Sequence, residues 1–253
     1  MVSEKLQGVS DLMPQVSIVV PMHNEEGAAA KLIHEICSAA QSLDAFEIVV
    51  VDDGSTDQTL ARLVHARQTA TQLRILRHTV AGGQSAAVHS GVTAARAAVC
   101  VTLDGDGQNP PSDLPLLWRP LLDDPGQKIG LVAGQRVGRQ DTQAKKLASR
   151  FANTLRGWML KDGTRDAGCG MKGFRRETFL ALPYFNHMHR YLPALFKAQG
   201  WRIVHVDVSH APRQSGQSKY TNIGRAAVGV WDLLGVAWLI KRAKTVRPED
   251  ETS

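Results

Sequence analysis

The stretch FEIVVVDDGSTD, residues Phe46–Asp57, shows the pattern on which the prediction of the fold rests. Its apolar run, Phe46–Val51, is almost uninterrupted, which is typical of a strand that helices cover on both faces. The acidic pair Asp52-Asp53 follows at once, and Asp57 can cap the helix that we expect next. A buried strand, an acidic turn and a helix in this order predict one unit of an α/β sheet.

The same alternation extends in both directions from this stretch. Further strands are predicted at Val16–Val20, which Pro21 stops, and at Leu73–Leu76, Val99–Leu103, Ile129–Ala133 and Ile203–Val208. Helices are predicted at Gly27–Gln41, Ser85–Ala97, Thr142–Lys161, Arg190–Gln199 and Thr221–Lys244, with another starting at Ser112. The glycine-rich segment Asp166–Arg175 is predicted to be a loop. This alternation predicts a mostly parallel sheet flanked by helices, with ligands bound beyond the carboxyl ends of its strands.

The chain has 253 residues and a formal net charge of +6 at pH 7. Its length suits one α/β domain, which we place at residues 15–210, followed by a basic loop and an amphipathic helix at 211–246. Residues 1–14 and 247–253 are predicted to be flexible tails. The positive charge favours anionic partners, a class that includes nucleic acid, a phospholipid surface and phosphorylated small molecules.

Three observations narrow the class of protein. Cys37, Cys100 and Cys169 are far apart, so neither a disulfide framework nor a structural zinc site is predicted. Met1–Ser10 lacks the apolar core of a signal peptide, and the apolar stretch Ala226–Ile240 is too short to span a bilayer. A nucleic-acid binder should interleave aromatic and basic residues, and the aromatic residues here are scattered, so no nucleic-acid partner is predicted.

Two carboxylates follow the fourth predicted strand. Asp104 and Asp106 are separated by Gly105, and Gln108 offers a further oxygen. Carboxylates at this spacing can share one hard divalent cation, and Mg²⁺ or Mn²⁺ held in this way also binds substrate phosphates. For this motif alone, an Asp/Gly turn between a strand and a helix is the alternative interpretation.

Polar residues also follow the first and second strands. Glu25, Asp52 and Asp53 stand where carboxylates can hydrogen-bond to a base or a ribose, although helix capping is an alternative role for this cluster. The pair Gly82-Gly83 opens a helix, and a glycine-rich turn at a helix N-terminus can bind an anion. For this segment alone, a flexible turn before a tightly packed helix is the preferred interpretation.

Basic residues occur where phosphates are expected. Arg136 follows the fifth strand, Arg150 lies on a predicted helix, and Arg213, Lys219 and Arg225 surround the segment RQSGQSKY. Guanidinium groups bind phosphate oxygens bidentately, and lysine supplies a point charge. A solvated surface is the alternative for any one of these residues.

Taken together, the motifs resemble family 2 glycosyltransferases, and more closely the dolichol-phosphate mannosyltransferases and other polyprenyl-phosphate sugar synthases. The family resemblance is carried, in order, by VSIVVPMHNE (Val16–Glu25), VVDDGSTDQT (Val50–Thr59), TLDGDGQNPPSD (Thr102–Asp113) and SRFANTL (Ser149–Leu155). The subgroup is supported by DAGCGMKGFR (Asp166–Arg175), HRYLPAL (His189–Leu195) and RQSGQSKY (Arg213–Tyr220).

The resemblance implies a GT-A, Rossmann-like fold and an inverting transfer of a sugar from a UDP- or GDP-linked donor to a polyprenyl phosphate, such as dolichyl or undecaprenyl phosphate. It implies Mg²⁺ or Mn²⁺ held by Asp104, Asp106 and Gln108. It places Pro21, His23, Glu25, Asp52, Asp53 and Gly83 at the donor, and Arg136, Arg150, Arg213, Ser218 and Lys219 at phosphates. The expected catalytic residues are Asp104, Asp106, Arg136 and Arg150. His23 stands where the family commonly has an aromatic or another residue, so the resemblance does not decide which nucleobase the donor carries.

The last predicted helix suggests how the enzyme would reach a lipid acceptor. Trp231, Leu234 and Trp238 share one face, and the basic residues Lys241 and Arg242 follow. Aromatic residues beside a basic cluster are typical of an interfacial helix on an anionic membrane, which predicts a cytoplasmic protein peripheral to the membrane. Alternatively, this face packs on the domain or on a second subunit of a homo-oligomer.

Two other functions stay open at this point. The first is a family 2 glycosyltransferase whose acceptor is a saccharide or a protein. The second is a non-catalytic protein that binds a nucleotide-sugar or a membrane. A phosphate acceptor is favoured by the basic residues, and a phosphate that is already ionised near neutral pH attacks without a strong general base.

Overall fold

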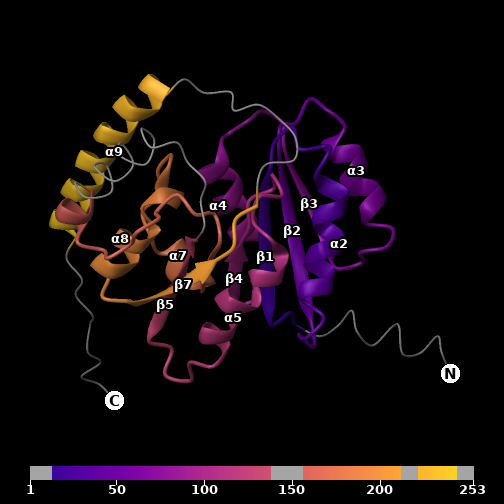
Figure 1. Cartoon of the computed structure of the whole chain (residues 1–253), viewed down its shortest axis with the longest axis horizontal. Helices are drawn as coiled ribbons and strands as arrows, with labels where there is room; N and C mark the ends of the chain where they lie inside the picture. The colour runs from indigo at the N-terminus through magenta and orange to yellow at the C-terminus, as the bar shows by residue number, and fades with distance from the viewer. Residues whose placement is uncertain (1–12, 138–155, 212–221, 244–253) are drawn as a thin grey trace, which may run out of the picture.

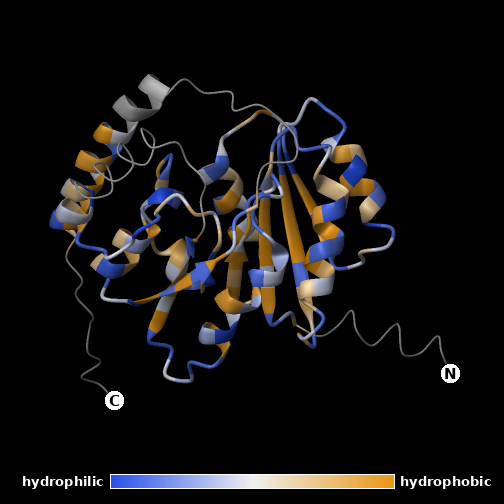
Figure 2. Ribbon diagram, in the orientation of Figure 1, coloured by the Kyte–Doolittle hydropathy of each residue, from blue (hydrophilic) through white to orange (hydrophobic). Residues whose placement is uncertain are grey.

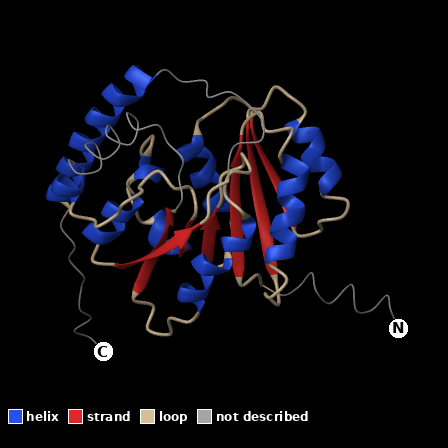
Figure 3. Cartoon of the chain, in the orientation of Figure 1, coloured by secondary structure: helices blue, strands red, loops and turns tan. Residues whose placement is uncertain are grey.

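The computed structural model describes residues 13–137, 156–211 and 222–243, and in these a seven-stranded sheet has the order β3-β2-β1-β4-β6-β5-β7 (Figure 1, Figure 3). The strands are β1 Val16–Met22, β2 Phe46–Asp53, β3 Leu73–His78, β4 Val99–Thr102, β5 Ile129–Arg136, β6 Lys172–Arg175 and β7 Arg202–Val208. β6 runs antiparallel to β4 and β5, and the other neighbouring strands are parallel. The predicted mostly parallel sheet flanked by helices is therefore confirmed.

Helices cover both faces of the sheet. One face packs against α2 (Ala29–Ala39), α3 (Thr59–Ala66) and α5 (Pro115–Leu122). The other face packs against α4 (Gln84–Ala94), α7 (Arg176–Leu180), α8 (Leu192–Ala198) and α9 (Asn222–Arg242). Two 3-10 helices, η1 (Pro111–Asp113) and η2 (Met188–Arg190), lie in the connections.

The uninterrupted apolar strands follow from this arrangement. Ile18 and Val20 of β1 point into the core beneath α2, whereas Val19 between them points into the core beneath α4. Side chains that alternate across a strand are then buried whichever face they point to, so both sets are apolar. Figure 2 shows these central strands as nearly continuous hydrophobic segments.

Two predictions about strands are wrong. Pro21 does not stop β1, which continues to Met22. The pairing of β1 with β4 ends at Val19, so on that side the missing N–H of Pro21 leaves no ladder hydrogen bond unmade. The segment Asp166–Arg175 is not all loop, because Lys172–Arg175 form β6 at an inner position of the sheet.

The predicted helices are confirmed with shorter bounds wherever the structure describes them. Of the predicted helix Thr142–Lys161, residues 156–160 are helical, and residues 142–155 lie outside the described residues. The predicted tails also lie outside the described residues, apart from Met13 and Pro14. In the part of the chain that the structure describes, no helix has the length and apolar character needed to cross a membrane.

Candidate active site

A pocket of about 230 Å³ lies where β1, β2 and β4 end, beside the start of α4. Its lining is built from the turns after these three strands and from the first turn of α4, and consists of Pro21, Met22, His23, Glu25, Asp53, Gln84, Ala87, Asp104, Gly105 and Asp106. The predicted residues Pro21, His23, Glu25, Asp53, Asp104 and Asp106 are therefore brought together by the fold. This placement at the carboxyl ends of parallel strands is the expected one for a ligand site.

Asp104 is held from two sides within the pocket. Gln84 Nε2 donates to Asp104 Oδ1 at 2.7 Å, and Asn109 Nδ2 lies 3.4 Å from Oδ2. Burial, and next the charge of nearby Asp106, raise the pKa of Asp104 to about 6. Two carboxylates that repel each other in this way gain from a shared cation.

The residues present fit a divalent metal ion. The backbone of Gly170 approaches Asp104 so closely that a Cβ there would lie 2.1 Å from Oδ1 and 2.2 Å from Oδ2. Asp104 and Asp106 offer hard oxygen atoms, which Mg²⁺ and Mn²⁺ prefer. No group of three His, Cys, Asp or Glu side chains that could hold a metal occurs among the described residues. The donor set thus suits an ion that one or two carboxylates and substrate phosphates bind together.

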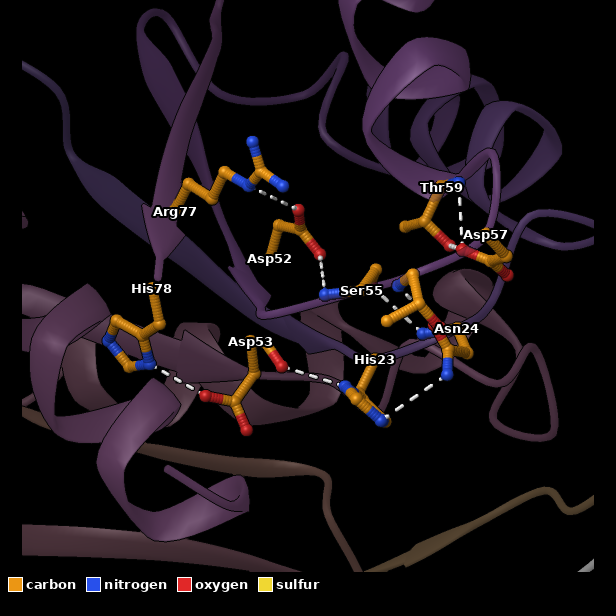
Figure 4. A network of polar contacts seen from close by, with 10 residues as sticks. His23, Asn24, Asp52, Asp53, Ser55, Asp57, Thr59, Arg77 and His78 are labelled. Atoms are coloured by element: carbon orange, nitrogen blue, oxygen red, sulfur yellow. Dashed lines mark hydrogen bonds and ion pairs between the residues drawn. The ribbon is translucent and has the colours of Figure 1, made fainter. Parts of the chain in front are cut away.

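The turns after β1 and β2 are joined by reciprocal hydrogen bonds (Figure 4). The Asn24 N–H donates to Ser55 Oγ at 3.0 Å, and the Thr56 N–H returns a bond to Asn24 Oδ1 at 2.8 Å. Asn24 has a φ of 55°, a left-handed conformation that asparagine tolerates better than most residues. The Glu25 N–H donates to Thr59 Oγ1 at 2.8 Å, so hydrogen bonds join the two polar motifs into one wall of the pocket.

Asp53 joins the Gly82-Gly83 turn to this wall by hydrogen bonds. Its Oδ1 accepts from the Gly82 N–H at 2.8 Å and its Oδ2 from the Gly83 N–H at 2.7 Å. His78 Nδ1 lies 2.6 Å from Oδ1 as well. The Asp53 carboxylate therefore fixes the turn that begins α4, in addition to lining the pocket.

The ring of His23 is oriented by the turn after β2. Its Nδ1 lies 2.7 Å from the carbonyl oxygen of Asp53, which can only accept, so Nδ1 carries the proton and donates. Asn24 Nδ2 lies 3.4 Å from Nε2 (Figure 4), and His23 belongs to the lining of the pocket.

Asp52 and Gly83 lie outside the pocket's lining. The Asp52 side chain is 0% exposed, accepts from the Ser55 N–H at 3.1 Å and lies 3.7 Å from Arg77 Nε. Gly83 lies at the positive φ of 85° that begins α4. Gln108 follows the acidic turn and donates its N–H to Asp106 Oδ1 at 3.1 Å.

Arg136 is paired with Asp166 rather than lining the pocket. Its Nε and Nη2 donate to the two Asp166 oxygens at 2.6 and 2.9 Å, a bidentate contact. Gln135 Oε1 accepts from the N–H groups of Arg165 and Asp166 at 2.9 Å each and so fixes this turn. The predicted residues Arg150, Arg213, Ser218 and Lys219 lie outside the described residues.

A second group of residues lies beside the pocket, among them Lys172, which the sequence did not indicate. Lys172, only 3% exposed, donates to the carbonyl oxygens of Ala167 and Cys169, and burial lowers its pKa. Lys172, Gln84 and His189 line a narrow crevice that reaches Asp104. Lys172, Gln84 and His189 come from three distant segments, so no local pattern connects them. Recognising β6 within the predicted loop would have placed Lys172 in the sheet beside the site.

Comparisons with known proteins agree with this geometry. A family model described as Glycosyl transferase family 2 matches residues 17–182. The chain is 33% identical over 248 residues to a dodecaprenyl-phosphate galacturonate synthase of Rhizobium johnstonii, covering 94% of this chain and 71% of that protein. It is 32% identical over 214 residues to an undecaprenyl-phosphate 4-deoxy-4-formamido-L-arabinose transferase of Sodalis glossinidius, covering 82% of this chain and 63% of that protein.

Solved structures support the fold. A glucosyl-3-phosphoglycerate synthase of Mycobacterium tuberculosis, solved with Mn²⁺, UDP and glucosyl-3-phosphoglycerate, superposes with a TM-score of 0.67 at 20% identity, covering 95% of this chain and 84% of that one. The same enzyme has been solved with Mg²⁺ and UDP, and superposes with a TM-score of 0.66 at 20% identity. The predicted GT-A-like architecture is confirmed by this likeness. With the family model spanning most of the described sheet, the chain belongs to glycosyl transferase family 2.

Proposed function

We propose that this chain moves a sugar from a UDP- or GDP-linked donor to a polyprenyl phosphate, with inversion and with the help of Mg²⁺ or Mn²⁺. The observation that carries the proposal is the Asp104–Asp106 pair, held beneath Gln84 in a pocket that also contains the turns after β1 and β2. Relatives named for the dodecaprenyl- and undecaprenyl-phosphate acceptors match more than four-fifths of the chain, which supports the acceptor class.

Asp104, Asp106 and Gln108 would hold the metal ion. When bound, the ion supplies positive charge to the diphosphate that leaves the sugar. The residues of this chain prepare the site: Gln84 orients one Asp104 oxygen, and Gly170 leaves room for the carboxylate. Arg136 and Lys172 add positive charge that acts on Asp104 from the β5–β6 side.

The donor's nucleotide would lie against the wall formed by the turns after β1 and β2. His23 lies in that wall, and the first turn of α4 lines the same pocket, where a helix N-terminus favours an anion. The acceptor phosphate needs no strong base, because its second pKa of about 6 leaves it largely ionised at neutral pH. Its attack on the anomeric carbon then depends mainly on alignment and on charge at the leaving group.

Helix α9 would bring the enzyme to the membrane that holds this acceptor. Its Leu233 and Val236 are buried in the core, whereas Trp231 is 75% and Trp238 62% exposed. Lys241 and Arg242 follow in its last turn and are exposed, which suits anionic headgroups. Exposed tryptophans beside cations favour the surface of an anionic bilayer over water. We therefore place the protein at the cytoplasmic face of a membrane, as a peripheral enzyme.

Incubation with a panel of nucleotide-sugars, Mn²⁺ or Mg²⁺ and a short polyprenyl phosphate tests the reaction. One donor should give a glycolipid, and Asp106→Asn or EDTA should abolish its formation, because the isosteric amide carries no charge for the ion. Asp123→Asn removes an exposed carboxylate at the end of α5 and should keep full turnover. Full turnover of Asp106→Asn would refute the metal assignment, and transfer to a saccharide alone would refute the acceptor.

A further inference from the structure

The connection between α7 and α8 touches two helices that are far apart in the sequence. Residues Asn186–Tyr191, which include η2, contact Ser85 at the start of α4 through His189. The same residues contact α9 through His187 and Tyr191. We call this segment the bridge, because it lies between the candidate active site and the helix with the exposed tryptophans (Figure 1).

The α4 end of the bridge reaches the pocket. His189 Nδ1 lies 2.7 Å from Ser85 Oγ, and the Ser85 side chain is fully enclosed. Gln84, the residue before Ser85, donates to Asp104. His189 also forms part of the crevice that reaches Asp104. A shift of His189 would therefore move the first turn of α4 and one wall of the site together.

At its α9 end the bridge makes two contacts, one of them with an acidic side chain. Asp232 is the only aspartate or glutamate in the sequence of α9, and its Oδ2 lies 2.8 Å from His187 Nδ1. Tyr191 Oη donates to the carbonyl oxygen of Gly229 at 3.3 Å, one turn earlier on the helix. An acidic side chain in an apolar and basic helix is explained by this contact, since it faces the domain and not the exposed face.

The backbone conformation of the bridge at His187 depends on the contacts that His187 makes. Its φ is 66°, in the left-handed region, which is uncommon for a residue other than glycine although histidine adopts it more often than most. Its N–H donates to Asn186 Oδ1 at 2.9 Å, and its ring is held by Asp232. Such a residue persists where its surroundings over-determine it, so losing the Asp232 contact favours a different backbone conformation.

We propose that the bridge makes Asp232 a positioning residue for the active site. Contact of α9 with an anionic membrane holds Asp232 against His187, which orders His189, Ser85 and the start of α4. The ordered site then binds the metal-nucleotide more tightly, because less conformational freedom is lost on binding. The effect of the membrane rests on the membrane contact proposed above for α9.

Calorimetric titration of the full chain with Mn²⁺ and UDP, with and without phosphatidylglycerol vesicles, tests the proposal. Vesicles should tighten UDP binding by about fivefold or more, and UDP with Mn²⁺ should tighten vesicle binding by the same factor. In Asp232→Leu this factor should fall to about one, although the variant should sediment with vesicles at least as well, having lost a negative charge. Asp232→Asn keeps an amide oxygen that can accept from His187 and should retain part of the effect. Asp44→Asn, an exposed carboxylate before β2, should behave as the natural protein.

Hydrogen exchange distinguishes a failure of the bridge from a general loss of stability and from a failure of the membrane contact of α9. In Asp232→Leu without vesicles, the amides of Gln84–Ala87 should exchange faster, whereas those of Leu63–Ala66 on α3 should not change; a general loss of stability would affect both. Unchanged exchange at Gln84–Ala87 would overturn the bridge, as would a vesicle effect in Asp232→Leu equal to that of the natural protein. Sedimentation with vesicles but no effect on UDP binding in the natural protein would also overturn it. Failure to sediment would refute the membrane contact of α9, and exchange at Gln84–Ala87 would still decide the bridge.

Discussion

Gly170 and the Asp104 carboxylate lie closer together than any other residue type at position 170 would allow. A Cβ on Gly170 would stand 2.1 Å from Oδ1, and Thr102 Oγ1 fixes this backbone by donating to the Gly170 carbonyl oxygen at 2.6 Å. The acidic turn after β4 and the segment before β6 are therefore fitted to each other. Asp104, the candidate metal ligand, is therefore positioned by Gly170, which lies more than sixty residues later in the sequence.

Gly170→Ala should weaken Mn²⁺ binding about 10- to 100-fold, the range that is usual for residues supporting a metal ligand. The added methyl group must displace the carboxylate or the backbone, and both positions are fixed. Titration of Mn²⁺ by electron paramagnetic resonance measures the affinity. Gly157→Ala is the control, since a Cβ there meets no atom of the described residues within 4 Å. Equal Mn²⁺ affinity in the two variants would contradict the role of Gly170.

Asp53→Asn should impair both folding and nucleotide binding. The amide NH₂ group cannot accept a hydrogen bond, so the backbone N–H of Gly82 or Gly83 loses its charged acceptor. We expect the free energy of unfolding to fall by about 1–3 kcal/mol, and UDP binding to weaken because the start of α4 is no longer fixed. Urea denaturation and calorimetry measure the two effects. Asp123→Asn should leave both unchanged, and an Asp53→Asn protein that binds UDP normally would exclude this role of the turn.

His189 should make the protein less stable in mild acid. Burial, and next the charge of Lys172, lower the pKa of His189 well below 6.5. The unfolded chain binds a proton at this histidine near pH 6.5 and the folded chain does not, so stability is lost as the pH falls below about 6.5. The loss from this group approaches about 1.4 kcal/mol per pH unit until the folded pKa is reached.

The comparison of the natural protein with His189→Gln isolates this contribution. Burial also lowers the pKa of His205, but that histidine is present in both proteins, so its effect cancels in the difference. Urea denaturation at several pH values should show a shallower decline below pH 6.5 in His189→Gln. Parallel curves for the two proteins would show that His189 is not kept neutral by the fold.

Replacing Trp231 and Trp238 together by alanine should reduce binding to phosphatidylglycerol vesicles at least tenfold, since two large aromatic groups no longer enter the interface. Both side chains are mostly exposed, so the free energy of unfolding should change little. Val64→Ala, on α3 and 54% exposed, is the control for loss of an exposed apolar group. If the tryptophan variant sediments with vesicles as well as the natural protein does, this face of α9 is not the membrane contact.

The alternation of strands and helices could be predicted because it depends on local patterns. Apolar runs such as Val16–Val20 and Phe46–Val51 are long enough to identify strands buried on both faces. β6 could not be predicted in this way: it has four residues, includes Lys172 and Gly173, and exists because β4 and β5 pair with it on either side. Its tertiary partners decide its conformation, whatever its own propensity.

The sequence by itself determined which residues would gather at the carboxyl ends of the strands, since the acidic turns after β2 and β4 and the polar turn after β1 are encoded beside the strands that carry them. Only the tertiary structure decided what each side chain does there. Asp53 fixes the glycine turn, Arg136 pairs with Asp166, and Asp232 holds His187, because these contacts join segments that no local pattern connects. Motifs follow from the order of residues along the chain, whereas the partner of each charged group follows from the packing of the whole sheet.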